Sequence, residues 1–297
     1  MSDHVFRFAP SPNGYLHLGH AFSALLNADA AAATGGRLLL RIEDIDLTRA
    51  RAEFEAAIFA DLAWLGMTWE EPVLRQSDRF EAYRGALAEL DRLGLTYPAF
   101  LSRGEIRAAI AAFEAEGRNW PRDPDGAPLY PGTERDWPET RRRDEMASGR
   151  PYALRLDTAR VLAGLADLTW RESDPFGVEP DTAIKADLAG WGDVILARKD
   201  TPASYHLAVT VDDAFQGVTD IVRGLDLKPA TGVHRLLQDL LGLPEPVYFH
   251  HRLIVDEDGR KLSKSEGSAG LKNLRKSGVM PAEIRLLLGF KRAAIAG

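Results

Sequence analysis

Residues 10–20 read Pro-Ser-Pro-Asn-Gly-Tyr-Leu-His-Leu-Gly-His, and the rest of the chain is organised around them. An apolar run at 5–9 precedes them, and an alanine- and leucine-rich stretch at 20–33 follows. This order predicts a strand, a tight turn and a helix start, which can direct backbone N–H groups towards phosphate. His17 and His20 are three residues apart and therefore share one helix face. A polyphosphate site and a surface turn with two ordinary histidines both fit this stretch alone.

A second stretch, Lys-Leu-Ser-Lys-Ser at residues 261–265, lies near the other end of the chain. Alone it is typical of a solvated loop. Lys261 and Lys264 could instead close over a polyphosphate, because lysines are compact point charges on flexible stems. With the two histidines on the other side, they would stabilise an in-line transition state at phosphorus through charge and position.

The composition excludes several classes of protein. The chain has 297 residues, 45% hydrophobic and 27% charged, which is typical of a globular protein. It contains no cysteine, which excludes disulfides, thiol catalysis and thiolate zinc sites and predicts a reducing cytoplasm. We expect no membrane span and no leader peptide. The net charge of −7 argues against non-specific nucleic-acid binding, and the arginine-rich stretch 141–143 is typical of a solvated helix face.

Hydrophobic spacing predicts an α/β fold, a parallel sheet split by an insertion. The expected strands of the sheet are 5–9, 38–42, 205–211, 218–222, 247–250 and 253–255, and the expected helices are 20–33, 54–65, 80–90, 233–241 and one from Pro281. Prolines between 121 and 138 mark an inserted module outside the sheet, with a helix at 103–116 and strands near 152–156 and 194–198.

These patterns divide the chain into four parts. They are the first half of a nucleotide-binding domain (1–97), an insertion expected to contact RNA (98–200), the second half of the domain with the lysine loop (201–265) and a short helical tail (266–297). Ligands of such sheets bind at the carboxyl ends of the strands, where the strand order reverses. The histidine turn, Glu43 and Arg223 are expected at that edge.

Three further stretches complete a family resemblance: Phe6–Pro12, Arg41–Asp46 and Gly217–Leu227. Residues 10–20 resemble the HIGH region, and 261–265 the KMSKS loop, of class I aminoacyl-tRNA synthetases. The other three stretches resemble the glutamyl branch of that class. The resemblance spans residues 5 to about 115 and 180 to 290. It implies a Rossmann-like catalytic domain that adenylates glutamate with ATP, releases pyrophosphate and transfers the glutamyl group to RNA.

The resemblance also implies roles for individual residues. ATP and its transition state would be served by His17, Gly19, His20, Lys261 and Lys264, and glutamate by Arg7, Ser11, Glu43, Tyr205 and Arg223. Two carboxylates and one ammonium call for arginine forks and one acid, so we expect Arg7 and Arg223 on carboxylates and Glu43 on the ammonium. A mutual ion pair between Arg7 and Glu43 is the alternative. Mg²⁺ is expected to accompany ATP, held by its phosphates.

The chain closes soon after the lysine loop, whereas full glutamyl-tRNA synthetases continue into a long anticodon-reading part. Its form resembles the short paralogues called glutamyl-Q tRNA(Asp) synthetases, which attach glutamate to the queuosine base in the anticodon of tRNA(Asp). The resemblance implies queuosine-containing tRNA(Asp), glutamate and ATP as partners of a monomer that needs no membrane. Unstacked loop bases are what proteins read best in RNA.

Those paralogues often hold zinc with Cys-x-Cys followed later by Tyr and Cys. The corresponding residues here are Ala99 and Leu101, then Tyr130 and Glu134. Alanine and leucine cannot ligate zinc, so we expect no structural zinc and apolar packing of Phe100 and Leu101 in its place.

Three alternatives remain open. They are a conventional glutamyl-tRNA synthetase core that charges tRNA(Glu), a catalytically idle paralogue that binds tRNA or glutamate, and a small-molecule nucleotidylyltransferase. The paired histidines and lysines disfavour an idle binder, and the glutamate-type arginines disfavour the nucleotidylyltransferase.

Overall fold

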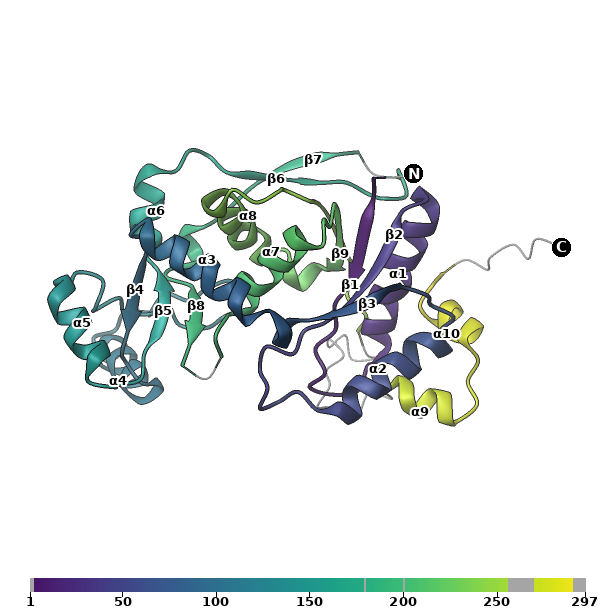
Figure 1. The fold of residues 1–297 in the computed structure, drawn as a ribbon, viewed down its shortest axis with the longest axis horizontal. Helices are drawn as coiled ribbons and strands as arrows, with labels where there is room; N and C mark the ends of the chain where they lie inside the picture. Colours follow the sequence, from purple (N-terminus) through teal and green to yellow (C-terminus); the bar gives the residue numbers. More distant parts are fainter. Residues whose placement is uncertain (1–2, 179, 200, 256–269, 291–297) are drawn as a thin grey trace.

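The computed structural model describes residues 3–178, 180–199, 201–255 and 270–290. Their centre is a seven-stranded sheet (Figure 1). Its neighbours pair in parallel except the last two, which are antiparallel. In spatial order the strands are β3 (Glu70–Arg75), β2 (Arg37–Ile42), β1 (Val5–Phe8), β9 (Asp220–Gly224), β10 (Val247–His251), β6 (Thr169–Glu172) and β7 (Thr182–Lys185). The predicted α/β fold with a Rossmann-like parallel sheet is confirmed.

Helices pack on both sides of this sheet. One side carries α1 (Leu18–Thr34), α2 (Ala52–Trp64), α9 (Leu271–Lys276) and α10 (Pro281–Leu287). The other carries α3 (Phe80–Arg92), α7 (Tyr205–Phe215) and α8 (Ala230–Leu241). Phe8 and Leu40 pack against α1, while their neighbours Arg7 and Arg41 contact Asp213 of α7. Alternation along β1 and β2 therefore points Phe8 and Leu40 to one side of the sheet and Arg7 and Arg41 to the other.

Helix α1 begins where the sequence predicts a helix start. His17 is its N-cap, and Gly35 ends it in the left-handed conformation. The following Gly36 lies against the first strand, and a Cβ there would be 2.6 Å from the carbonyl oxygen of His4. Any side chain at residue 36 would therefore push β2 away from β1.

A small antiparallel sheet lies at the far end of the molecule (Figure 1). It comprises β4 (Thr96–Ala99), β5 (Ala153–Leu156) and β8 (Ile195–Arg198), with α4 (Arg103–Glu114), α5 (Glu139–Ala147) and α6 (Thr158–Gly164) beside it. Single 3₁₀ turns occupy Gln76–Arg79, Ala189–Trp191 and Leu225–Leu227. Arg141 and Arg143 are exposed on α5, as expected of a solvated helix face.

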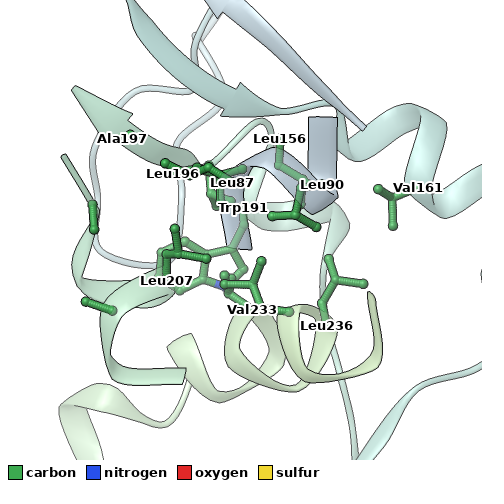
Figure 2. Close-up of a cluster of buried hydrophobic side chains, with 14 of the residues drawn as sticks. Leu87, Leu90, Leu156, Val161, Trp191, Leu196, Ala197, Leu207, Val233 and Leu236 are labelled. Atoms are coloured by element: carbon green, nitrogen blue, oxygen red, sulfur yellow. The ribbon is translucent and has the colours of Figure 1, made fainter. Parts of the chain in front are cut away.

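One apolar cluster joins the small sheet to the helices of the large one (Figure 2). In it Leu156 and Leu196 of the small sheet meet Leu87 of α3, Leu207 of α7 and Val233 of α8. All five side chains are at most 8% exposed. Their burial resists separation of the two sheets, because each buried leucine or valine contributes about 1.5–3 kcal/mol.

Two local expectations were wrong. Residues 205–211 form the start of helix α7 and not a strand, with the Ser204 hydroxyl accepting the Leu207 N–H as N-cap. Apolar runs of this length do not distinguish a buried strand from a buried helix. The strand expected at 253–255 does not form either: residues 253 and 254 are irregular, and residue 255 makes only a bridge. In addition, β6 and β7 come from the segment expected outside the sheet, and they extend it.

The turn between β4 and α4 is held by a buried carboxylate. Glu134, 1% exposed, accepts hydrogen bonds from the Phe100 N–H at 2.9 Å and from the Tyr130 hydroxyl at 2.7 Å. The Tyr130 oxygen in turn accepts the Leu101 N–H at 3.3 Å. The Phe100 ring stacks on Trp137, with ring centroids 5.8 Å apart. Hydrogen bonds donated to Glu134 therefore supplement the apolar packing expected here.

Replacing Glu134 by alanine should lower the free energy of unfolding by about 1–3 kcal/mol, because two or more buried donors would lose their acceptor. Urea denaturation measures the loss, with Glu139→Ala as the control, since the Glu139 side chain is 81% exposed. A zinc chelator should leave the midpoint of the unmodified protein unchanged. An unchanged midpoint for Glu134→Ala would contradict the role given to this carboxylate.

Candidate active site

A cavity of about 630 Å³ opens at the carboxyl ends of β1, β2 and β9. Strand order reverses between β1 and β9, where ligands of such sheets bind. Every candidate residue within the described ranges lines it: Arg7, Ser11, His17, Gly19, His20, Glu43, Tyr205 and Arg223. Lys261 and Lys264 lie outside the described residues. Sequence segments more than 200 residues apart thus meet in one cavity.

The two histidines form the N-terminus of α1. The Nδ1 atom of His17 accepts the Gly19 N–H at 3.1 Å, and Nδ1 of His20 accepts the His17 N–H at 3.2 Å. Their ring centroids are 3.8 Å apart. Since both Nδ1 atoms accept, each neutral ring carries its proton on Nε2. A Cβ at Gly19 would lie 3.0 Å from Cε1 of His17, so glycine is needed for this ring position.

A buried network of four charges underlies the cavity. Arg7 Nε donates to Asp213 Oδ1 at 3.0 Å, and Arg41 NH1 donates to the same oxygen at 2.7 Å. Arg41 NH2 reaches Glu43 Oε1 at 3.2 Å. Arg7 is therefore paired with Asp213 rather than with Glu43, in contrast to the alternative considered from the sequence. Two cations and two anions balance within this network.

The two carboxylates of the network differ in acidity. Burial raises the pKa of Glu43, although Arg41 and Arg7 act in the opposite direction. For Asp213 the cost of burial is outweighed by Arg7 and Arg41, and its pKa lies below the usual range. A cation arriving next to Glu43 would favour its charged form, which fits the ammonium-binding role predicted for this residue.

Arg223 has a different environment. It lies in β9, is 4% exposed and has four acceptors, none of them a carboxylate. Its guanidinium donates to His234 Nδ1 at 3.0 Å, His250 Nε2 at 3.2 Å, Thr231 Oγ1 at 2.7 Å and the Leu227 carbonyl at 3.3 Å. Among the described residues no carboxylate lies within ion-pair distance of Arg223.

The histidines beside Arg223 are held neutral. Burial and the charge of Arg223 lower the pKa of His250 to about 4 and keep that of His234 well below its usual range. Among the described residues, the groups that contact Arg223 are therefore neutral and do not balance its positive charge at neutral pH. Burying a charge without an opposite charge nearby is costly, so Arg223 is a candidate for binding an anion.

Sequence reasoning missed four residues that surround Arg7 and Arg223 in the structure: Asp213, Arg41, His234 and His250. Arg41 carried a usable signal, because it interrupts the apolar run 38–42, and charged residues are rarely buried unless paired. Asp213 follows a run taken for a strand, so its place on a helix facing β1 was not foreseen. His234 lies within an ordinary amphipathic helix, where nothing in the spacing distinguishes it.

Comparison with known proteins agrees with this geometry. Residues 4–292 match the family of class I tRNA synthetases (E and Q), catalytic domain. The chain is 47% identical to a glutamyl-Q tRNA(Asp) synthetase of Rhodobacter capsulatus over 96% of this chain and 100% of that protein. It is 35% identical to a glutamate–tRNA ligase of a Synechococcus strain over 96% of this chain and 56% of that protein.

Solved structures of glutamate tRNA ligases also resemble this chain. A glutamate tRNA ligase from Elizabethkingia meningosepticum matches 89% of this chain with a TM-score of 0.72 at 29% identity. The match covers 52% of that ligase, so the chain spans about half its length. The chain belongs to the catalytic-domain family of the class I glutamyl and glutaminyl tRNA synthetases, and it is a ligase of the aminoacyl-tRNA synthetase type.

Proposed function

We propose that this protein activates glutamate with ATP and transfers the glutamyl group to the queuosine base in the anticodon of tRNA(Asp). Activation forms a bond between a glutamate carboxylate oxygen and the α-phosphorus of ATP and breaks the bond to pyrophosphate. Transfer then moves the acyl group from the adenylate to the acceptor on the RNA and releases AMP.

The observation that carries the proposal is the buried guanidinium of Arg223, which contacts no carboxylate among the described residues. A ligand carboxylate would supply the missing anion at a buried guanidinium, where charge-assisted hydrogen bonds are strongest. Glu43, in the same cavity, would receive the amino acid's ammonium. Arg7 would serve the second carboxylate while remaining paired with Asp213, and Tyr205 and Ser11 would add hydroxyl donors at the cavity wall.

The N-terminus of α1 would receive the phosphates of ATP. Helix N-termini favour anions because their first N–H groups lack partners within the helix. The Nε2 protons of His17 and His20 would add two donors at the same point. Lys261 and Lys264 would contact the phosphates from the side opposite the two histidines. Mg²⁺ would arrive on the phosphates, because the described residues contain no cluster of three metal-ligating side chains.

A second cavity, of about 450 Å³, offers a place for the RNA acceptor. Tyr205 lines both cavities, and the second also includes Tyr130, Trp191, Arg155 and Arg198 from the segment 98–200. Aromatic rings and arginines are what an unstacked nucleotide requires. An acceptor bound here would lie next to the activated amino acid.

The choice of queuosine over a terminal ribose rests on the relatives. The relatives named glutamyl-Q tRNA(Asp) synthetase are covered over 80–100% of their length, and the Synechococcus glutamate–tRNA ligase over 56%. We further propose that the protein is a monomer acting in the cytoplasm.

Transfer of labelled glutamate to RNA tests the proposal. We expect incorporation into tRNA(Asp) that contains queuosine, and none into tRNA(Asp) without it. Because the label would sit on an anticodon base, incorporation should survive removal of the terminal adenosine.

The competing outcome is charging of tRNA(Glu), which depends on the terminal adenosine. That result would overturn the queuosine assignment and establish a conventional glutamyl-tRNA synthetase core. Activity on neither RNA, with no glutamate-dependent ATP–pyrophosphate exchange, would overturn activation as well.

A further inference from the structure

Three side chains, His234, His250 and Thr231, surround the guanidinium of Arg223, and we call them the Arg223 cradle. We propose that the cradle aims Arg223 at the carboxylate of glutamate without neutralising its charge, so that its members are positioning residues. This inference rests on the proposed function, since it takes glutamate as the ligand.

The proton arrangement of the cradle follows from arginine chemistry. A guanidinium has five N–H donors and no acceptor, so each ring nitrogen facing Arg223 must be unprotonated. The proton of His234 therefore sits on Nε2, which lies 3.1 Å from His206 Nδ1 and donates to it. The proton of His250 sits on Nδ1, which donates to Glu172 Oε1 at 2.7 Å. Both tautomers are fixed by hydrogen bonds on both sides of the ring.

The cradle leaves one donor for a ligand. The hydrogen bonds to the cradle and to the Leu227 carbonyl use four of the five N–H groups of Arg223. Rotation of the guanidinium would break several of them together. Arg223 is therefore held in one orientation before glutamate binds, which avoids the cost of ordering a long side chain on binding.

Within the described residues, the only carboxylate that hydrogen bonds to the cradle is that of Glu172, and the His250 ring separates it from Arg223. Glu172 contacts the far side of His250 and is itself paired with Lys228 Nζ at 3.0 Å. It also accepts the Trp170 indole N–H at 3.2 Å. Glu172 thus fixes the orientation of the His250 ring, while Lys228 balances the charge of Glu172. An acid in direct contact with Arg223 would compete with the ligand carboxylate, and this arrangement avoids that competition.

Glu172 lies on β6, in the segment inserted between the halves of the sheet. β6 pairs with β10, which carries His250, through Tyr248 and Glu172. The β6–β7 hairpin therefore supports the orientation of Arg223 as well as extending the sheet.

Replacement of His234 tests the cradle by ATP–pyrophosphate exchange. His234→Leu keeps the apolar volume but removes the acceptor, and it should raise the KM for glutamate at least about tenfold. His234→Asn restores an acceptor at the place of Nδ1 and should stay within about threefold of the unmodified protein. The KM for ATP should change less than twofold in both. Glu172→Gln should raise the KM for glutamate by about threefold or more.

Gln238→Leu is the matched control. Gln238 lies on the same helix, is 2% exposed and donates a hydrogen bond to the Tyr248 hydroxyl at 3.0 Å, so it is connected to Arg223 only through the Tyr248 ring, whose centroid lies 5.3 Å from the guanidinium. The Gln238→Leu substitution should lower the urea midpoint of unfolding without changing the KM for glutamate. Equal KM changes in His234→Leu and Gln238→Leu, or no rescue by asparagine, would overturn the cradle alone. Absence of glutamate-dependent exchange in the unmodified protein would instead overturn the proposed function together with this inference.

Discussion

Arg223→Ala is expected to lower kcat/KM for glutamate in ATP–pyrophosphate exchange by about 100- to 1,000-fold. Removing one partner of a buried, hydrogen-bonded charge pair costs about 2–5 kcal/mol, and each 1.4 kcal/mol corresponds to a factor of ten. The proposed ligand carboxylate would lose its cation at a position where the guanidinium is only 4% exposed. Arg223→Lys should recover only part of the loss, because an ammonium cannot donate to the cradle and to the ligand in the same fork geometry.

The control for this variant is Arg171→Ala. Arg171 is exposed on β6 and does not line the cavity, so its removal changes the net charge equally without touching the site. Folding is checked by thermal unfolding, and we expect Arg223→Ala to remain folded because the histidines left behind are neutral. Full retention of glutamate-dependent exchange by Arg223→Ala would exclude this arginine from the glutamate site.

Sequence patterns predicted the elements that carry a local signal. The run 38–42 and the capped stretch after residue 17 gave β2 and α1, since an apolar run and a helix start are visible without tertiary context. The run 205–211 was misassigned because it is buried as a helix between two sheets, and burial on several sides removes the helical period. The strands β6 and β7 were missed because their residues alternate weakly and their place depends on tertiary pairing: β6 pairs with β10, and β7 pairs with β6.

For the site, motifs identified residues but not their partners. Eight candidates known from the family resemblance gather at one cavity, which shows how strongly strand ends constrain position. Which arginine is paired with which carboxylate depends on long-range contacts such as Arg7 with Asp213, 206 residues apart. No local pattern encodes such a contact. The roles of the candidates in binding remain predictions.

The three buried arginines of this site differ in whether a carboxylate balances their charge. Arg7 and Arg41 share Asp213, and their charges are balanced inside the protein. Arg223 faces only neutral groups among the described residues and is balanced by no carboxylate. The first pair can therefore stabilise the fold, whereas Arg223 raises the free energy of the empty site. The carboxylate of the proposed glutamate ligand would recover this cost.

Asp213→Asn is accordingly expected to be the most destabilising of the substitutions considered, lowering the free energy of unfolding by about 3–5 kcal/mol. Asparagine keeps the shape of the side chain but leaves Arg7 and Arg41 without their shared anion, and both are at most 5% exposed. Urea denaturation near pH 7 measures the loss. Asp239→Asn is the control, because Asp239 is 44% exposed beside Arg235, and it should change stability by less than about 1 kcal/mol.

The pH dependence of this difference gives a second test. Arg7 and Arg41 hold the pKa of Asp213 below its usual range despite burial, so the folded state favours the charged carboxylate. The stabilisation is therefore complete above the unfolded pKa of about 3.9 and is lost as the pH falls through the lower folded value. The unmodified protein and Asp213→Asn should differ by a constant amount above about pH 5 and converge on acidification. A constant difference down to the acid limit would mean that packing, and not charge, accounts for the effect of Asp213.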